Sequence, residues 1–163
     1  MADVYVVMGV AGCGKTTVGR LLAQRTGLPF YDADDFHPEA NVRKMKKGVP
    51  LTDADRAPWL AQLARLLMRA ATGGGAVLAC SALRDSYRRV LAGKDPGAVR
   101  FIHLKGDRRL ILERMKKRAG HFMPPALLDS QFETLEEPAG ALTVTIDRPP
   151  EEIVDEILRS GRG

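Results

Sequence analysis

Short apolar runs alternate with longer amphipathic stretches along this chain. Most of the runs are continuous rather than interrupted at every second position, a pattern typical of strands that are buried on both faces of a parallel sheet. Polar or glycine-rich residues separate each run from the stretch that follows it. We expect strands at 4–9, 29–34, 76–82, 99–106 and 142–147.

The stretches between these runs carry apolar residues at helical spacing. Residues 15–26 place polar side chains on one face and end at Gly27, and Thr52 is suited to cap the helix that follows it. Strands separated by helices form βαβ units, so the sequence predicts an α/β fold whose parallel sheet is covered on both faces. The expected helices lie at 15–26, 38–47, 53–71, 84–92 and 107–117. A further helix is expected to end at about residue 133, and the last one to begin at residue 150.

Length and composition fit one packed domain. The chain has 163 residues, of which 45% are hydrophobic and 28% are charged, and these are ordinary globular values. No apolar run reaches the roughly 18 residues of a membrane-spanning helix, and no signal-peptide pattern is visible. Cys13 and Cys80 lack the spacing of a disulfide framework or a zinc site, so we expect them only to pack. We expect a single domain over residues 1–163, located in the cytoplasm, with no membrane partner.

A net charge of +5 suits either nucleic acid or an anionic small molecule. The basic residues gather in three groups, at 43–47, 84–89 and 108–118. Aromatic residues make up only 6% of the chain, and no RNA-binding or zinc-finger pattern accompanies the charge. We therefore expect a small anionic substrate and no nucleic-acid partner.

The strongest local motif is a glycine-rich loop at residues 9–16, GVAGCGKT, which matches G-x-x-x-x-G-K-[ST]. A predicted strand precedes it and a predicted helix follows it, as in loops that bind a nucleoside triphosphate. Glycines let backbone N–H groups turn toward an anion, and the helix adds its positive N-terminal end. Lys15 is expected to reach the β- and γ-phosphates, and Thr16 to coordinate Mg²⁺. The predicted ATP site contains Gly9, Gly12, Cys13, Gly14, Lys15, Thr16 and Thr17.

Absent motifs favour a kinase over the other proteins that use this loop. A GTPase would carry [NT]-K-x-D, and the nearest match, at 104–107, begins with a leucine. A motor ATPase would end a later strand in an acid that supports Mg²⁺, but the third predicted strand ends at Cys80 and Ser81. The acids that can take this role follow the second predicted strand, at Asp32, Asp34 and Asp35.

Phosphoryl transfer needs an oriented acceptor, help with its proton and positive charge around the transferring group. Asp34 either orients the acceptor and takes its proton or supports Mg²⁺, and Asp32 or Asp35 supports the Mg²⁺ shell or the local backbone. If the strand continues, Asp32 and Asp34 point the same way. Arg114 and Arg118 are four residues apart on one helix, and they either supply the positive charge or form a solvated surface.

Two further segments resemble the small, single-domain gluconokinases. These are DADDFHPEANVRKMKKGVPLTDADRAPWL at 32–60 and RMKKRAGHFMPPALLDSQFETLEEP at 114–138. The glycine loop is shared by a very large superfamily, whereas these two segments are characteristic of that family. Cys13 within the loop and Pro124-Pro125 are departures that leave the resemblance intact.

The resemblance implies a P-loop fold like that of nucleoside monophosphate kinases, with a five-stranded parallel sheet. It implies an acceptor-binding helical segment at about 34–60, a lid at about 114–133, and a homodimer. The implied reaction is phosphate transfer from ATP to D-gluconate. Another small polyhydroxy acid such as shikimate is the alternative acceptor, and an NTP-dependent switch is a rival from another class.

Within that framework, individual residues receive expected roles. His37 either donates to a sugar hydroxyl or caps the helix that begins at Pro38, and Arg56 suits the gluconate carboxylate. Trp59 is expected to be core or pocket wall. Pro149 would wall the adenine ring and Arg114 would stack on it. His121 either contacts hydroxyl groups of the acceptor or lies on the lid surface. The other expected acceptor contacts are Arg43, Ser81, Arg84, Arg88, His121 and Gln131.

Overall fold

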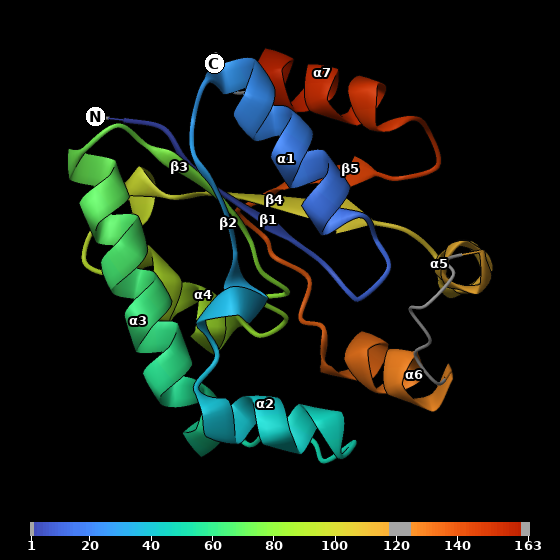
Figure 1. Cartoon of the computed structure of the whole chain (residues 1–163). Coiled ribbons are helices and arrows are strands. Elements are labelled where there is room, and N and C mark those ends of the chain that lie inside the picture. The colour runs from blue at the N-terminus through green and yellow to red at the C-terminus, as the bar shows by residue number, and fades with distance from the viewer. Residues whose placement is uncertain (1, 118–124, 161–163) are drawn as a thin grey trace.

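A five-stranded parallel sheet with helices on both faces forms the protein (Figure 1). The computed structural model describes residues 2–117 and 125–160. The strands are β1 (Val4–Met8), β2 (Phe30–Asp32), β3 (Ala76–Ala79), β4 (Arg100–Lys105) and β5 (Leu142–Thr145). The α-helices are α1 (Lys15–Thr26), α2 (Glu39–Lys46), α3 (Asp53–Thr72), α4 (Asp85–Ala92), α5 (Arg108–Lys116), α6 (Pro125–Thr134) and α7 (Pro150–Ser160), and the 3₁₀ turns are η1 (Ala33–Phe36) and η2 (Pro96–Ala98).

The strand order β2-β3-β1-β4-β5 puts β1 at the centre of the sheet. After β1 the chain crosses to the edge strand β2 and returns to β3 beside β1, and later it continues on the other side to β4 and then β5. Open α/β sheets bind ligands beyond the carboxyl ends of their strands, where the strand order reverses. In this protein that point is the carboxyl end of β1, so the glycine loop lies where a ligand is expected.

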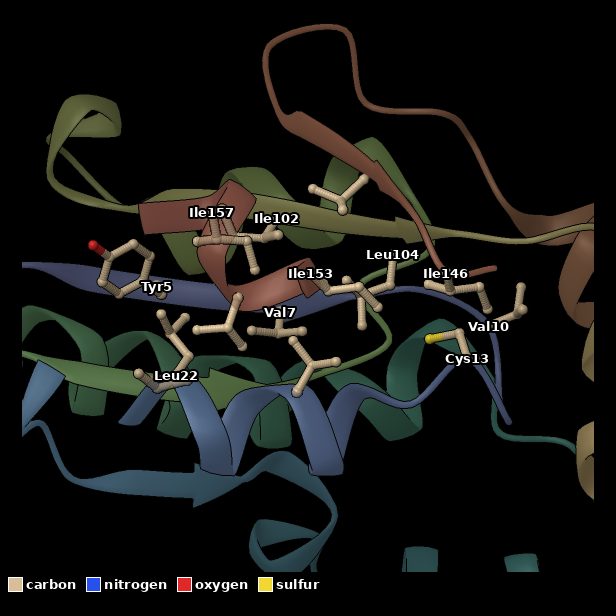
Figure 2. Packing of buried hydrophobic residues seen from close by; sticks show 14 of the residues in the cluster. Tyr5, Val7, Val10, Cys13, Leu22, Ile102, Leu104, Ile146, Ile153 and Ile157 are labelled. Atoms are coloured by element: carbon tan, nitrogen blue, oxygen red, sulfur yellow. The ribbon is translucent and has the colours of Figure 1, made fainter. Parts of the chain in front are cut away.

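Alternate residues of the central strand face two separate cores. Tyr5 and Val7 pack with apolar residues of α1 and α7, as Figure 2 shows. Val4, Val6 and Met8 pack on the other face with α3 and α4. Both faces are thus covered, as the continuous apolar runs predict.

The expected caps are present. Gly27 ends α1 in the left-handed conformation, with φ of 73°, which a residue without Cβ adopts at no steric cost. Thr52 caps α3 through a capping box in which the Thr52 hydroxyl and the Asp55 carboxylate each accept a backbone N–H of the other residue. Among the described helices, none is both long and apolar enough to cross a membrane.

The second strand is shorter than its sequence suggests. It ends at Asp32, because the Asp32 carboxylate accepts the N–H of Asp34 at 3.0 Å and starts a 3₁₀ turn. Trp59 donates its indole N–H to the Ala33 carbonyl at 2.7 Å and pins this turn from α3. The condition for Asp32 and Asp34 to point the same way, a strand that continues past Asp32, is therefore not met. Likewise, β3 stops at Ala79 instead of continuing to residue 82.

Candidate active site

The glycine loop joins β1 to α1 in a conformation that requires its glycines. Gly9, Gly12 and Gly14 have φ of 149°, 79° and 95°, values that other residues rarely adopt. A Cβ on Gly9 would lie 2.7 Å from Cys13 Sγ and 2.9 Å from the Leu104 carbonyl oxygen. The loop thus has the tight backbone that presents N–H groups to an anion.

Lys15 extends its ammonium group back over this loop. Its Nζ donates to the carbonyl oxygens of Gly9 and Val10 at 2.9 and 3.0 Å. The positive charge is therefore held at the mouth of the loop, where phosphate groups would lie. This is the position expected for Lys15 from the motif.

Thr16 and Asp32 come together beside the loop, as the sequence predicts for a Mg²⁺ site. The Thr16 hydroxyl lies 3.4 Å from Asp32 Oδ2. Both offer hard oxygen ligands, and Mg²⁺ at nucleotide sites takes few protein ligands and completes its shell with water and phosphate oxygens. Accordingly, the described residues contain no cluster of three or more His, Cys, Asp or Glu that could hold a metal by itself. The residues present fit such an ion.

Asp34 lies at the start of the acceptor segment, close to His37. Its Oδ1 is 4.0 Å from His37 Nε2, and its side chain is 84% exposed. Partial desolvation by the surrounding protein raises the pKa of Asp34, and the negative charge of Asp32 raises it further. A carboxylate with raised proton affinity is suited to accept a proton from a hydroxyl group.

His37 is held as a neutral donor that faces Asp34. Its ring stacks on Trp59 with centroids 4.1 Å apart, and the side chain is 4% exposed. Burial lowers the pKa of His37, and this effect exceeds the opposing one of Asp34. The Asn41 amide nitrogen lies 3.3 Å from His37 Nδ1 and donates to the Asp55 carbonyl at 2.9 Å. Because that nitrogen is a donor, Nδ1 accepts and the proton is on Nε2.

Sequence reasoning missed Asn41, which is 3% exposed. Its spacing of four residues from His37 was the available signal, since residues four apart meet on a helix. Trp59 is core, as predicted, but it is also a stacking surface, for His37, which was the alternative to core or pocket wall.

The basic residues of the acceptor segment divide into two kinds. Arg56 is partly buried: it donates to the Leu51 carbonyl at 2.9 Å and the Tyr87 hydroxyl at 3.2 Å. It is also close enough to His37 to lower the pKa of that ring. Arg43, by contrast, pairs with Glu39 at 3.2 Å on the exposed side of α2. The structure brings Arg56 near His37 but holds Arg43 in an exposed ion pair.

Ser81 and Arg84 follow β3 at the carboxyl end of the sheet. Ser81 is partly exposed, and its carbonyl oxygen accepts the N–H of Gly9 at 3.3 Å, which ties it to the glycine loop. Arg84 is exposed and precedes α4. Burial raises the pKa of Tyr87, and the positive charges of Arg56 and Arg84 oppose that increase, so both guanidinium groups lie near this phenol.

Arg88 was expected to contact the acceptor, but the structure shows it bonded to backbone carbonyl oxygens. It is only 6% exposed, and its guanidinium donates to the carbonyl oxygens of Ala82 at 2.7 Å and Glu136 at 2.8 Å. Ala82 has φ of 44°, a strained value for a residue with a side chain. Arg88 therefore fixes two chain segments, because its donors are used by backbone acceptors.

We expect Arg88→Met to lower the free energy of unfolding by about 2–4 kcal/mol, because two buried carbonyls lose a charged donor. Urea denaturation measures this change. Arg89→Met, at the exposed neighbouring position, should change it by less than about 0.5 kcal/mol. An unchanged stability together with a raised acceptor KM would instead return Arg88 to the acceptor site.

A cavity of about 290 Å³ opens beside the glycine loop between α5 and α7. Its lining includes Gly12, Thr17 and Arg114, and Arg114 also donates to the Ile146 carbonyl. This is where the adenine ring is expected, but the proline in the lining is Pro150, and the exposed Pro149 is not part of it. Arg148 and Lys117 also line the cavity and were missed.

Comparison with known proteins shows the family of the chain. Residues 11–160 match the family described as shikimate kinase. The gluconokinase of Gluconobacter oxydans strain 621H is 47% identical over 94% of this chain and 88% of its own length. The chain belongs to the gluconokinases of the shikimate kinase family. The thermoresistant gluconokinase of Escherichia coli K12 is 41% identical over 98% of this chain and 95% of its own. The crystal structure of a gluconokinase from Sinorhizobium meliloti 1021 superposes with a TM-score of 0.86 and 45% identity, covering 96% of this chain and 90% of that chain.

The segment expected to form a lid, at about 114–133, is described only in part. Arg118 and His121 lie outside the described residues. Gln131 lies in α6, where its side-chain oxygen accepts the N–H of Ala11 in the glycine loop at 2.6 Å. A larger cavity of about 900 Å³ lies at the amino ends of β4 and β5, far from this loop, and Arg88 is the one expected site residue in its lining.

Proposed function

We propose that this protein transfers the γ-phosphoryl group of ATP to D-gluconate and forms 6-phospho-D-gluconate. The observation that carries the proposal is the acceptor segment, where Asp34 lies 4.0 Å from neutral His37 and near Lys15 of the glycine loop, and where Arg56 lies near His37. Family membership over nearly the whole chain supports gluconate as the acceptor. Lys15 and the loop N–H groups hold the triphosphate, and the cavity next to them takes the base.

In this proposal Asp34 orients the acceptor hydroxyl and accepts its proton as the oxygen attacks. The Nε2–H of His37 donates to a neighbouring hydroxyl group of the substrate or to Asp34. Thr16 and Asp32 hold Mg²⁺, which neutralises phosphate charge. Trp59 keeps both groups in place, because it stacks on His37 and fixes the turn that carries Asp34.

The gluconate carboxylate would lie near Tyr87, between Arg56 and Arg84. Some donors of Arg56 are already used, in hydrogen bonds to Leu51 and Tyr87 and in an ion pair with Asp53. Arg84, on the other hand, makes no side-chain hydrogen bond or ion pair with the described residues. An exposed guanidinium with free donors can bind a carboxylate through two parallel hydrogen bonds.

Arg84→Ala is expected to raise the KM for gluconate by about 10-fold or more, which corresponds to the loss of a charge-assisted hydrogen bond. The affinity for ATP should stay within about twofold, since the glycine loop is untouched. Steady-state kinetics measures both values. Arg65→Ala, on the exposed side of α3, is the control with the same charge change. An unchanged gluconate KM in Arg84→Ala would place the carboxylate elsewhere.

The proposed reaction is tested by coupled detection of ADP with a panel of acceptors. Gluconate should give the highest kcat/KM, shikimate a much lower value, and ATP without an acceptor only slow turnover. Preference for shikimate would support the alternative acceptor. Rapid turnover that needs no acceptor would instead support an NTP-dependent switch.

We also propose that the enzyme acts as a homodimer in the cytoplasm. Support comes from the resemblance and from exposed apolar side chains on α3 and α4, Met68 at 64% and Val90 at 43% exposure. Size-exclusion chromatography with light scattering distinguishes a dimer from the 17.8 kDa monomer.

A further inference from the structure

A side chain of α6 occupies a backbone donor of the glycine loop. The Gln131 side-chain oxygen accepts the Ala11 N–H at 2.6 Å, across a separation of 120 residues. Figure 1 shows α6 next to the loop that joins β1 to α1. The contact is a hydrogen bond in which the backbone N–H of the loop is the donor and the carboxamide oxygen is the acceptor.

The Ala11 N–H belongs to the set of groups that cradle phosphates in such loops. It lies between Gly9 and Gly12, next to the Lys15 ammonium, which bonds to the carbonyls of Gly9 and Val10. The Gln131 oxygen therefore lies where an oxygen of the triphosphate would meet this end of the loop. Lys15 reaches the β- and γ-phosphates, so this is the end near the transferred group.

The position of Gln131 is fixed by its surroundings. Leu128, on the same helix, is fully buried in the core that α1 and α7 cover. After α6, Glu136 makes three hydrogen bonds. Its N–H donates to the Leu83 carbonyl at 2.8 Å. Its carbonyl accepts from Arg88 at 2.8 Å, and its carboxylate accepts the Asp85 N–H at 2.9 Å. The helix is thus anchored at the point from which Gln131 reaches the loop.

A carboxamide carries both an acceptor and a donor, and rotation about its last torsion exchanges them at little cost. When a phosphoryl oxygen takes the Ala11 N–H, the Gln131 NH₂ group can turn to donate to that same oxygen. Glutamate at this position would repel the phosphoryl group. Methionine would keep the length of the side chain and offer neither strong hydrogen-bonding group.

We propose that Gln131 is a positioning residue for the terminal phosphoryl group of ATP, which it contacts together with the Ala11 N–H. This inference rests on the proposed use of ATP as phosphoryl donor, and it replaces the expectation that Gln131 contacts polyol hydroxyls. With this role, α6 takes part in nucleotide recognition, because Gln131 contacts the phosphoryl group that ATP has and ADP lacks.

Calorimetric titration with Mg²⁺-ADP and with a Mg²⁺-β,γ-imido triphosphate, without any acceptor, tests this role. Gln131→Met should weaken triphosphate binding by about 10-fold, the value of one hydrogen bond to a charged group, and change ADP binding by less than about twofold. Gln131→Glu should weaken triphosphate binding at least as much. In turnover assays, Gln131→Met should lower kcat and leave the gluconate KM unchanged.

Ser130→Glu is the control, since it adds the same negative charge to the exposed side of α6. It should leave both nucleotide affinities unchanged. Equal losses for ADP and the triphosphate, unchanged affinities, or a rise confined to the gluconate KM would each overturn the proposal. If the wild-type protein binds the triphosphate but does not phosphorylate gluconate, the proposed acceptor fails, while the nucleotide titrations still decide the role of Gln131.

Discussion

Lys15→Ala is expected to lower the turnover number by about 10³-fold or more, which corresponds to about 4 kcal/mol of lost transition-state stabilisation. The ammonium group lies at the mouth of the glycine loop, where negative charge develops during phosphoryl transfer. No other described lysine is hydrogen-bonded to this loop, so another lysine should not replace its charge.

The measurement is initial-rate kinetics at saturating ATP and gluconate. Lys15→Met keeps the aliphatic stem and shows whether the effect belongs to the charge. Lys94→Ala, at an exposed position after α4, is the control with the same charge change. Circular dichroism should show that each variant keeps its fold. Near-normal turnover of Lys15→Ala would contradict phosphoryl transfer at this loop.

Asp34→Asn is expected to lower turnover by about 10²-fold or more, the usual contribution of a positioned acid–base group. The change keeps size and hydrogen bonding but removes the charge and the affinity for a proton. ATP affinity should barely change. Asp35→Asn, at the next residue of the same turn, should be much milder. If Asp35→Asn is inactive and Asp34→Asn works normally, the acceptor binds on the other side of this turn.

The acid side of the pH profile gives a second measure of Asp34. Burial and Asp32 raise the pKa of Asp34, so its carboxylate takes up a proton at a higher pH than an ordinary aspartate does. The active form is the deprotonated one, hence kcat/KM should fall as pH decreases through this raised pKa. The residual activity of Asp34→Asn should lack that decrease.

The fold could be predicted because its signals are local. Continuous apolar runs marked the parallel strands, and caps such as Gly27 and Thr52 marked helix ends to within a residue. The glycine loop fixed the phosphate site through its own backbone. The strand β2 is shorter than predicted, also for a local reason: the Asp32 side chain caps a turn, and this hydrogen bond competes with extension of the strand.

The acceptor site was less predictable, because its geometry depends on contacts between distant segments. Nothing in the pattern around Arg88 shows that its donors meet the carbonyls of Ala82 and Glu136. The Gln131 contact with Ala11 joins residues 120 apart. A sequence pattern shows which residue types carry chemistry, whereas tertiary packing decides which of them face the same ligand.

The most direct test is product analysis after incubating the wild-type protein with ATP, Mg²⁺ and D-gluconate. Phosphorus NMR and mass spectrometry should detect 6-phospho-D-gluconate, formed in equal amount to ADP and about 10³-fold more slowly, or not at all, when Lys15→Ala replaces the wild type. Formation of ADP with inorganic phosphate and no phosphorylated gluconate would contradict gluconate kinase activity.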